Sequence, residues 1–120
     1  MILSEYIKRT KEALDVDYVQ LIGDSQREIQ VVASCAGAGG DFVKLAQNSG
    51  ADVFVTGEIK YHEAQDSIGL NIPILAAGHF KTEYPVLPVL IDRLQKAIDG
   101  LQYKVGILLS VNQKDPYIVL

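Results

Sequence analysis

The chain has 120 residues, of which 48% are hydrophobic and 22% are charged, and its formal net charge is −4. This length allows one compact core and is too short for two ordinary domains, so we expect a single domain over residues 1–120. No stretch is basic enough to bind a phosphate backbone, and no apolar run approaches the roughly twenty residues of a membrane span. We therefore expect neither a nucleic acid nor a membrane as a partner.

The first residues carry neither a basic stretch nor a long apolar stretch of the kind found in secretion signals. The single cysteine, Cys35, cannot form an internal disulfide, which suits a reducing compartment. The predicted location is the cytoplasm.

The first elements follow from apolar spacing. Residues 4–14 carry apolar side chains at helical intervals between charged ones, which predicts an amphipathic helix. Residues 18–23 and 29–35 have the composition of strands, and the turn-forming residues 24–27 separate them. This arrangement predicts a β-hairpin.

A coarse repeat follows, in which three apolar strands run into Gly37, Gly57 and Gly78 at intervals of about twenty residues. Helical patterns at 41–48 and 59–68 fill the intervals, as in successive βα units. The strands are too continuously apolar to face water on either side. The sequence therefore predicts an α/β fold, a three-layer α/β/α sandwich with a mostly parallel central sheet.

The last third of the chain begins with a helix whose start lies between residues 85 and 87 and whose end is marked by Gly100. A start at Thr82 is disfavoured because Pro88 would lack a donor that such a helix needs, so residues 79–84 are predicted to be a loop. Residues 102–110 alternate like a strand, and residues 116–120 would form an edge strand or lie against a partner.

The strand exits of a parallel sheet lie at one edge, where open α/β folds bind ligands. His79 and Glu83 follow one such exit and could ligate a divalent metal such as zinc, manganese or iron through an imidazole nitrogen and a carboxylate oxygen. The alternative is a turn histidine hydrogen-bonded to a nearby carboxylate or carbonyl. A catalytic zinc site needs about three protein ligands, so this pair is half of a site.

Glu58 and His62 lie four residues apart at the start of the helix predicted over 59–68, and hence on one helical face. They could act as a general acid/base couple or support a metal ligand. The alternative is that Glu58 only complements the helix dipole and His62 is half exposed.

The glycine-rich segment around Gly37 and Gly39 joins a strand to a helix, and its free amides could hold an anion or phosphate. It lacks the Lys and Ser/Thr of a P-loop, and Phe42 stands where a dinucleotide fingerprint has its third glycine. A tight turn for close helix–sheet packing is the alternative. Cys35 could be a nucleophile beside a histidine, but a small thiol at a strand end usually serves packing.

Taken in order, three segments resemble the C-terminal half of the Nif-three-like dinuclear metal-centre proteins, many of which are named GTP cyclohydrolase I type 2 homologues. The segments are residues 32–39, residues 51–62 with Thr-Gly-Glu-x-x-Tyr-His, and residues 77–83 with Gly-His-Phe-x-Thr-Glu. The likeness spans nearly the whole chain, down to the closing Asp115-Pro116-Tyr117.

The resemblance implies that His79 and Glu83 donate to a pair of divalent metals, with Glu58 and His62 near the same pocket. The family's His-His-Pro motif and further aspartate ligand belong to an N-terminal half that this chain does not show, and no third histidine replaces them. The family usually forms toroidal hexamers, so the resemblance implies a homo-oligomer or a partner half.

Two functions remain open. The first is the metal-binding domain of a divalent-metal-dependent hydrolase with an incomplete dinuclear site, acting on a small-molecule substrate. The alternative is a non-catalytic assembly or ligand-binding module that retains the fold without turnover.

Overall fold

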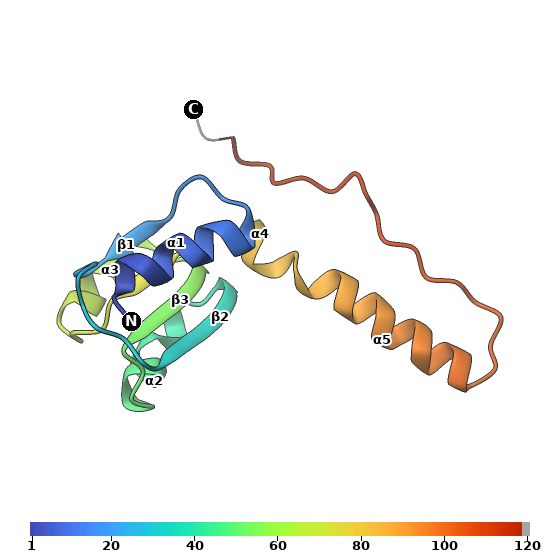
Figure 1. Cartoon of the computed structure of the whole chain (residues 1–120), viewed down its shortest axis with the longest axis horizontal. Helices are drawn as coiled ribbons and strands as arrows, with labels where there is room; N and C mark the ends of the chain where they lie inside the picture. Colours follow the sequence, from blue (N-terminus) through green and yellow to red (C-terminus); the bar gives the residue numbers. More distant parts are fainter. Residues whose placement is uncertain (119–120) are drawn as a thin grey trace.

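The computed structural model describes residues 1–118, and its centre is a four-stranded sheet (Figure 1). The order of the strands across the sheet is β1-β4-β3-β2. β2, β3 and β4 are parallel, and β1 is antiparallel to β4. Their bounds are β1 Gln20–Ile22, β2 Val32–Ala38, β3 Val53–Glu58 and β4 Ile74–Ala76.

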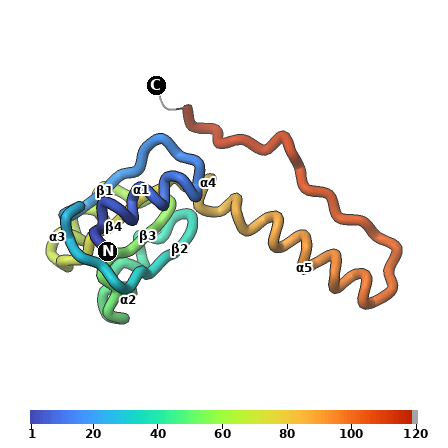
Figure 2. The backbone as a smooth tube through the Cα atoms, viewed as in Figure 1, coloured from blue at the N-terminus to red at the C-terminus, as the bar shows by residue number. Residues whose placement is uncertain are grey.

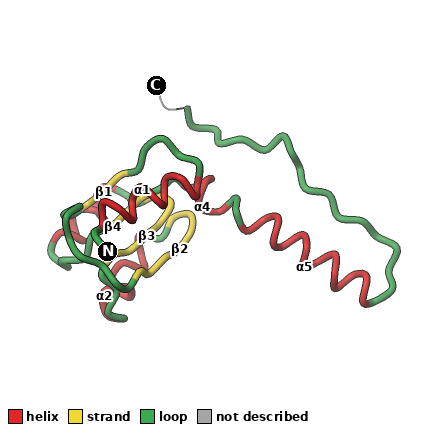
Figure 3. The backbone as a smooth tube through the Cα atoms, in the orientation of Figure 1, coloured by secondary structure: helices red, strands yellow, loops and turns green. Residues whose placement is uncertain are grey.

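Helices lie on both faces of this sheet (Figure 3). Their bounds are α1 Leu3–Leu14, α2 Val43–Asn48, α3 Tyr61–Ile68, α4 His79–Glu83 and α5 Val86–Gly100, with a 3₁₀ turn η1 at Gly40–Phe42. The predicted three-layer α/β/α sandwich with a mostly parallel sheet is confirmed. No helix in residues 1–118 has the length and apolar character required to cross a membrane.

Alternation along β3 divides the core between the two faces of the sheet. Val53 points to the α1 side, where it packs with Leu3 and Ile29, and Phe54 points to the α2 side, where it packs with Val43. β3 and β4 are buried along almost their whole length because they have a strand on each side and helices on both faces. The two central strands, β3 and β4, therefore form a well-packed support for the residues that follow them at their carboxyl ends.

The predicted hairpin between residues 18–23 and 29–35 is wrong. β1 pairs with β4, through Gln20 with Ala76 and Ile22 with Ile74, while β2 pairs with β3 at the opposite edge. β4 is fully buried, so its open edge would leave buried backbone groups without partners, and β1 satisfies them. The turn-forming residues between the two strand-like segments therefore did not predict which strand each of them pairs with.

Residues 79–84 were predicted to be a loop, and this prediction is also wrong, because α4 occupies His79–Glu83. Gly78 has φ 93°, a value that favours glycine, and it turns the chain sharply from β4 into α4. Pro85 then separates α4 from α5, so Pro88 falls in the first turn of α5, where a missing donor costs nothing. The helical stretch therefore begins at His79 and is interrupted at Pro85, rather than beginning at residues 85–87.

The strand predicted over 102–110 has no partner strand and forms no ladder, and residues 116–118 form no strand either. The remaining residues of the edge strand predicted over 116–120 lie outside the described part of the chain. Smaller differences concern the helices predicted at 41–48 and 59–68, which begin at Val43 after the 3₁₀ turn and at Tyr61.

Replacing Phe54 with alanine should destabilise the protein by about 3–5 kcal/mol, because this side chain is 2% exposed at the centre of the α2-side core. Urea unfolding followed by circular dichroism measures the change. Leu94→Ala on α5 is the control: Leu94 is 45% exposed, so its truncation should cost less than about 1 kcal/mol. Equal costs for the two variants would contradict this account of the core.

Asp52 should make stability depend on acid pH. Hydrogen bonds of 2.8 Å from the amides of Val31 and Gln30 hold the pKa of the Asp52 carboxyl below its ordinary value of 3.8, and Arg27 lowers it further. This stabilisation is present above the unfolded-state pKa and is lost as pH falls through the lower folded-state pKa. Asp52→Asn should flatten the acid limb of stability against pH, measured by urea unfolding. Asp92→Asn, which breaks an exposed ion pair with Lys96, should leave that limb unchanged.

Candidate metal centre

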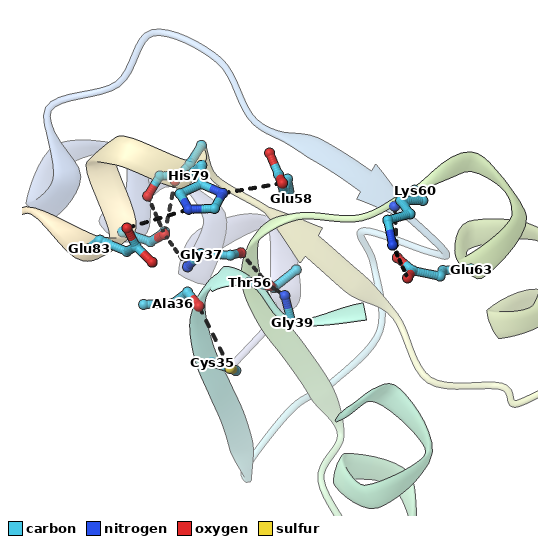
Figure 4. Close-up of polar contacts among 12 residues, drawn as sticks. Cys35, Ala36, Gly37, Gly39, Thr56, Glu58, Lys60, Glu63, His79 and Glu83 are labelled. Atoms are coloured by element: carbon cyan, nitrogen blue, oxygen red, sulfur yellow. Dashed lines mark hydrogen bonds and ion pairs between the residues drawn. The ribbon is translucent and has the colours of Figure 1, made fainter. Parts of the chain in front are cut away.

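The carboxyl ends of the three parallel strands meet at one edge of the sheet, and α4 lies against β2 and β3 there (Figure 4). β3 ends at Glu58, and β4 leads through Gly78 into α4. His79 and Glu83 are four residues apart on α4 and therefore project from the same side of it. The edge brings together Glu58, His79 and Glu83.

His79 stands between two carboxylates. Its Nδ1 lies 3.2 Å from Glu58 Oε1, and its Nε2 lies 3.4 Å from Glu83 Oε2 (Figure 4). The three side chains are 42–55% exposed, so solvent weakens their mutual attraction and the contacts add little to stability. An arrangement this open is better suited to receiving a ligand than to holding the fold together.

The spacing between His79 and Glu83 fits a shared metal ion. Two ligand atoms, each about 2.1 Å from a tetrahedrally coordinated ion, lie about 3.4 Å apart. Nε2 and Oε2 are separated by that distance without any movement. Glu58 meanwhile faces the opposite nitrogen, where a carboxylate that accepts the N–H fixes the ring of a metal-ligating histidine.

Glu58 and His62 do not share a helical face, so the geometric basis of that pairing is wrong. Glu58 is the last residue of β3, and α3 begins only at Tyr61. His62 is exposed, and within residues 1–118 it makes no ion pair or side-chain hydrogen bond. Chemistry by His62 stays a prediction, while Glu58 is tied to His79 by contact.

The glycines of this edge allow backbones and side chains to approach closely. A Cβ at Gly57 would lie 2.6 Å from Thr82 Oγ1, 2.7 Å from the Gly37 carbonyl oxygen and 2.8 Å from His79 Cα. A Cβ at Gly37 would collide with Glu83 Oε1 and lie 3.3 Å from His79 Nε2. Gly37 also has φ 69°, so both the lack of space for a Cβ and the backbone conformation favour glycine at this position.

The amides of Gly37 and Gly39, which we expected to be free for an anion, donate within the protein. The Gly37 amide donates to Thr82 Oγ1 at 3.1 Å, and the Gly39 amide donates to Thr56 Oγ1 at 2.9 Å. Thr56 in turn donates to the Gly37 carbonyl at 3.0 Å (Figure 4). Gly37 lies in the irregular end of β2, where the register with β3 shifts between Cys35 and Ala38, and these hydrogen bonds fasten that end to β3 and α4. Anion binding by this segment stays a prediction.

Thr82 and Thr56 were not among the residues singled out in the sequence. Thr82 Oγ1 lies 2.9 Å from the carbonyl of Gly78 and 3.0 Å from that of His79 while it accepts from Gly37. A threonine one helical turn after the glycine that opens a helix is the signal that could have revealed it. Cys35, by contrast, packs against the α2-side core, as a small apolar residue does.

Within residues 1–118, no three or more His, Cys, Asp and Glu side chains are arranged to hold a metal ion. His79 and Glu83 are therefore too few to form a complete metal site by themselves in these residues. An open cleft of about 470 Å³ adjoins this pair, lined in part by Glu83, by Phe80 and Tyr84 of the α4 region, and by Gln113 from the C-terminal segment. The rings of Phe80 and Tyr84 pack 5.2 Å apart between centroids.

Thr82→Val should destabilise the chain by about 1–3 kcal/mol, because valine keeps the shape but leaves the part-buried Gly37 amide without its acceptor. Thr82→Ser keeps the hydroxyl and should cost clearly less. Urea unfolding measures both. The hydrogen-bonding role of Thr82 would be contradicted if serine and valine were equally destabilising.

The chain is similar to proteins of one known family. The model of the Duf34/NIF3 (NGG1p interacting factor 3) family matches residues 1–116. A GTP cyclohydrolase 1 type 2 homolog of Clostridium acetobutylicum is 35% identical over 117 residues, which are 98% of this chain and 44% of the relative. A homolog of the same name from Listeria innocua is 33% identical over 112 residues, 93% of this chain and 30% of the relative.

Solved structures give the same result. A Bacillus cereus protein related to NIF3 aligns with 100% of this chain and 33% of its own, with 30% identity and a TM-score of 0.90. A Staphylococcus aureus hypothetical protein aligns with 100% of this chain and 40% of its own, with 28% identity and a TM-score of 0.89. The chain thus spans less than half the length of these relatives. By sequence and by fold, it belongs to the Duf34/NIF3 family.

Proposed function

We propose that this chain supplies half of a divalent metal centre in a metal-dependent hydrolase, with His79 and Glu83 as ligands. The observation that carries the proposal is the 3.4 Å separation of His79 Nε2 and Glu83 Oε2 at the edge where three parallel strands end. Zinc, manganese and iron all accept imidazole and carboxylate ligands. The family match shows only that the chain is related to these proteins, and the metal-binding and hydrolase roles are what we propose in addition.

The residues of this chain would divide the work as follows. His79 and Glu83 hold the ion, and Glu58 accepts the Nδ1 proton of His79 and so keeps Nε2 unprotonated and aimed at it. A bound divalent ion would supply the Lewis acidity that makes water a nucleophile at neutral pH. Glu58 is on this account a positioning residue rather than the general base that we first considered.

The cleft beside Glu83 is the proposed place for a small-molecule substrate. Its Phe80 and Tyr84 rings offer apolar surface, and Glu83 and Thr82 are polar residues of the lining. The relatives that match this chain are named GTP cyclohydrolase 1 type 2 homologs. That name is consistent with a substrate carrying a planar ring.

On this proposal the remaining ligands come from another polypeptide segment, since residues 1–118 hold no cluster of three or more suitable side chains. A second copy of the chain in a homo-oligomer or a partner half would supply them. The same finding favours the second candidate function, a non-catalytic ligand-binding or assembly module. Turnover of a phosphodiester by this chain alone in excess manganese would exclude that candidate.

Metal affinity tests the ligand pair. In titrations with Zn²⁺ or Mn²⁺ against a chromophoric competitor, His79→Ala should weaken binding at least about tenfold because an imidazole ligand is lost. The chain has only two histidines, so His62→Ala is a matched control and should bind like the wild type. No binding by the wild type, or equal losses in both variants, would sink the proposal.

Glu58→Gln tests the positioning role separately. Removing the carboxylate that orients a ligating histidine typically costs about 10–100-fold in metal affinity. Because Glu58 is 53% exposed, the same substitution should leave the urea midpoint of the metal-free protein unchanged. Lost stability with unchanged affinity would show that Glu58 has a purely structural role.

A further inference from the structure

The side chains of the cleft beside Glu83 offer nothing that attracts an anion. Among the described residues of its lining there is no Lys, Arg or His, and Glu83 carries the only formal charge. The chain as a whole has a formal net charge of −4. Because phosphate is bound mainly by cationic side chains and free backbone amides, only amides could hold a phosphate group in this cleft.

The helix end at the cleft does not supply those amides. Val86 and Leu87, in the first turn of α5, belong to the lining, and a helix N-terminus binds anions through its free N–H groups. Here the Leu87 amide donates to the Tyr84 carbonyl at 3.1 Å, and Pro88 has no amide hydrogen. Two of the first three positions of α5 therefore have no donor for an anion.

The Thr82 hydroxyl, which also belongs to the lining, is occupied within the protein. It accepts from the Gly37 amide at 3.1 Å. It lies 2.9 Å from the Gly78 carbonyl oxygen and 3.0 Å from that of His79, so its proton is directed at these carbonyls. A hydroxyl has a single proton to donate, and none remains for a ligand.

The rest of the lining is mainly aromatic and aliphatic. Phe80 and Tyr84 are half-buried, with 5.2 Å between the ring centroids and 30° between the ring planes. Val86 and Leu87 add branched aliphatic side chains, and Ala36 adds little bulk. Aromatic side chains of this kind favour a second flat ring that stacks on them. The lining thus suits a flat group without charge.

Gln113 supplies the polar group that such a ring requires. It is an exposed residue of the lining, and its side-chain amide carries two donor hydrogens and one acceptor oxygen. A Gln amide pairs through two hydrogen bonds with a ring edge that presents a donor beside an acceptor, as it does with adenine. Nitrogen heterocycles with an amino or oxo substituent have such edges.

We propose that this cleft binds a neutral planar nitrogen heterocycle, stacked on Phe80 and Tyr84 and hydrogen-bonded at its edge by Gln113, and that it does not bind phosphate. The volume of about 470 Å³ falls in the range of small-molecule sites, about 300–1,000 Å³. The inference rests on the proposed function in one respect, because it assigns a substrate class to the cleft that this function uses. Binding of the ring itself needs no metal ion.

Ligand-observed NMR titration of the full chain with adenine, in buffer that contains a chelator, tests the proposal. We expect saturable binding that inorganic tripolyphosphate does not displace. Tyr84→Leu should weaken binding at least about fivefold because a stacking ring is lost, whereas Tyr84→Phe keeps the ring and should bind like the wild type. Tyr61→Leu is the matched control, since Tyr61 is 80% exposed and is not among the described residues of the lining.

Three results would overturn the proposal: no saturable binding of adenine, displacement of adenine by tripolyphosphate, or equal affinities of Tyr84→Leu and Tyr84→Phe. If Tyr84→Leu does not fold, Phe80→Leu takes its place with the same expected loss. The metal centre and the cleft fail separately. A chain that binds adenine but neither Zn²⁺ nor Mn²⁺ would refute only the metal centre, and a chain that binds metal but not adenine would refute only this inference.

Gln113→Leu tests the recognition of the ring edge. Adenine carries an amino group that purine lacks, so the wild type should prefer adenine to purine at least about fivefold. Gln113→Leu should bind the two rings equally and bind purine like the wild type. Because Gln113 is exposed, the variant should melt at the wild-type temperature. An undiminished preference for adenine in Gln113→Leu would overturn the role assigned to Gln113.

Discussion

The close approach at Gly57 is the constraint on which the rest of the candidate metal centre depends. Thr82 Oγ1, the Gly37 carbonyl and His79 Cα all lie within 2.8 Å of where a Cβ at this residue would be. Only glycine lets β3, the irregular end of β2 and the start of α4 meet at one point. The position of His79 is thereby fixed by backbone packing rather than by its own exposed contacts.

This constraint explains why a half-exposed site can still be precise. The contacts of His79 with Glu58 and Glu83 are solvent-screened and cannot orient α4 by themselves. Thr82 does so instead, because its hydroxyl contacts the carbonyls that open α4 and also accepts from the Gly37 amide near the end of β2. Backbone packing thus positions His79 and Glu83, while their half-exposed side chains stay accessible to solvent.

Local sequence patterns predicted most of the helices and strands but not which strands pair with one another. The glycine-terminated strands and the sandwich were predictable because apolar runs and helix stops are written into short windows of sequence. The β1–β4 pairing was not predictable in this way. β1 pairs with the buried edge of β4, which is more than fifty residues further along the chain and becomes its neighbour only in the folded sheet. Helix α4 was missed because Pro88 was taken to exclude any helix before Pro85, whereas the chain breaks the helix at Pro85.

The contacts of the candidate site were likewise predictable within one short segment but not between distant segments. His79 and Glu83 were recognisable because they share one short segment, and their spacing survives in α4. The partnership of Glu58 with His79 joins two elements twenty-one positions apart, so it needed the strand ends to be brought together. Residues 103–111 carry the alternation of a strand, but within the described residues they pair with no strand and run apart from the sheet (Figure 2). Alternation is therefore not sufficient to form a strand, because the neighbour that completes the backbone hydrogen bonds is not contained in the strand's own sequence.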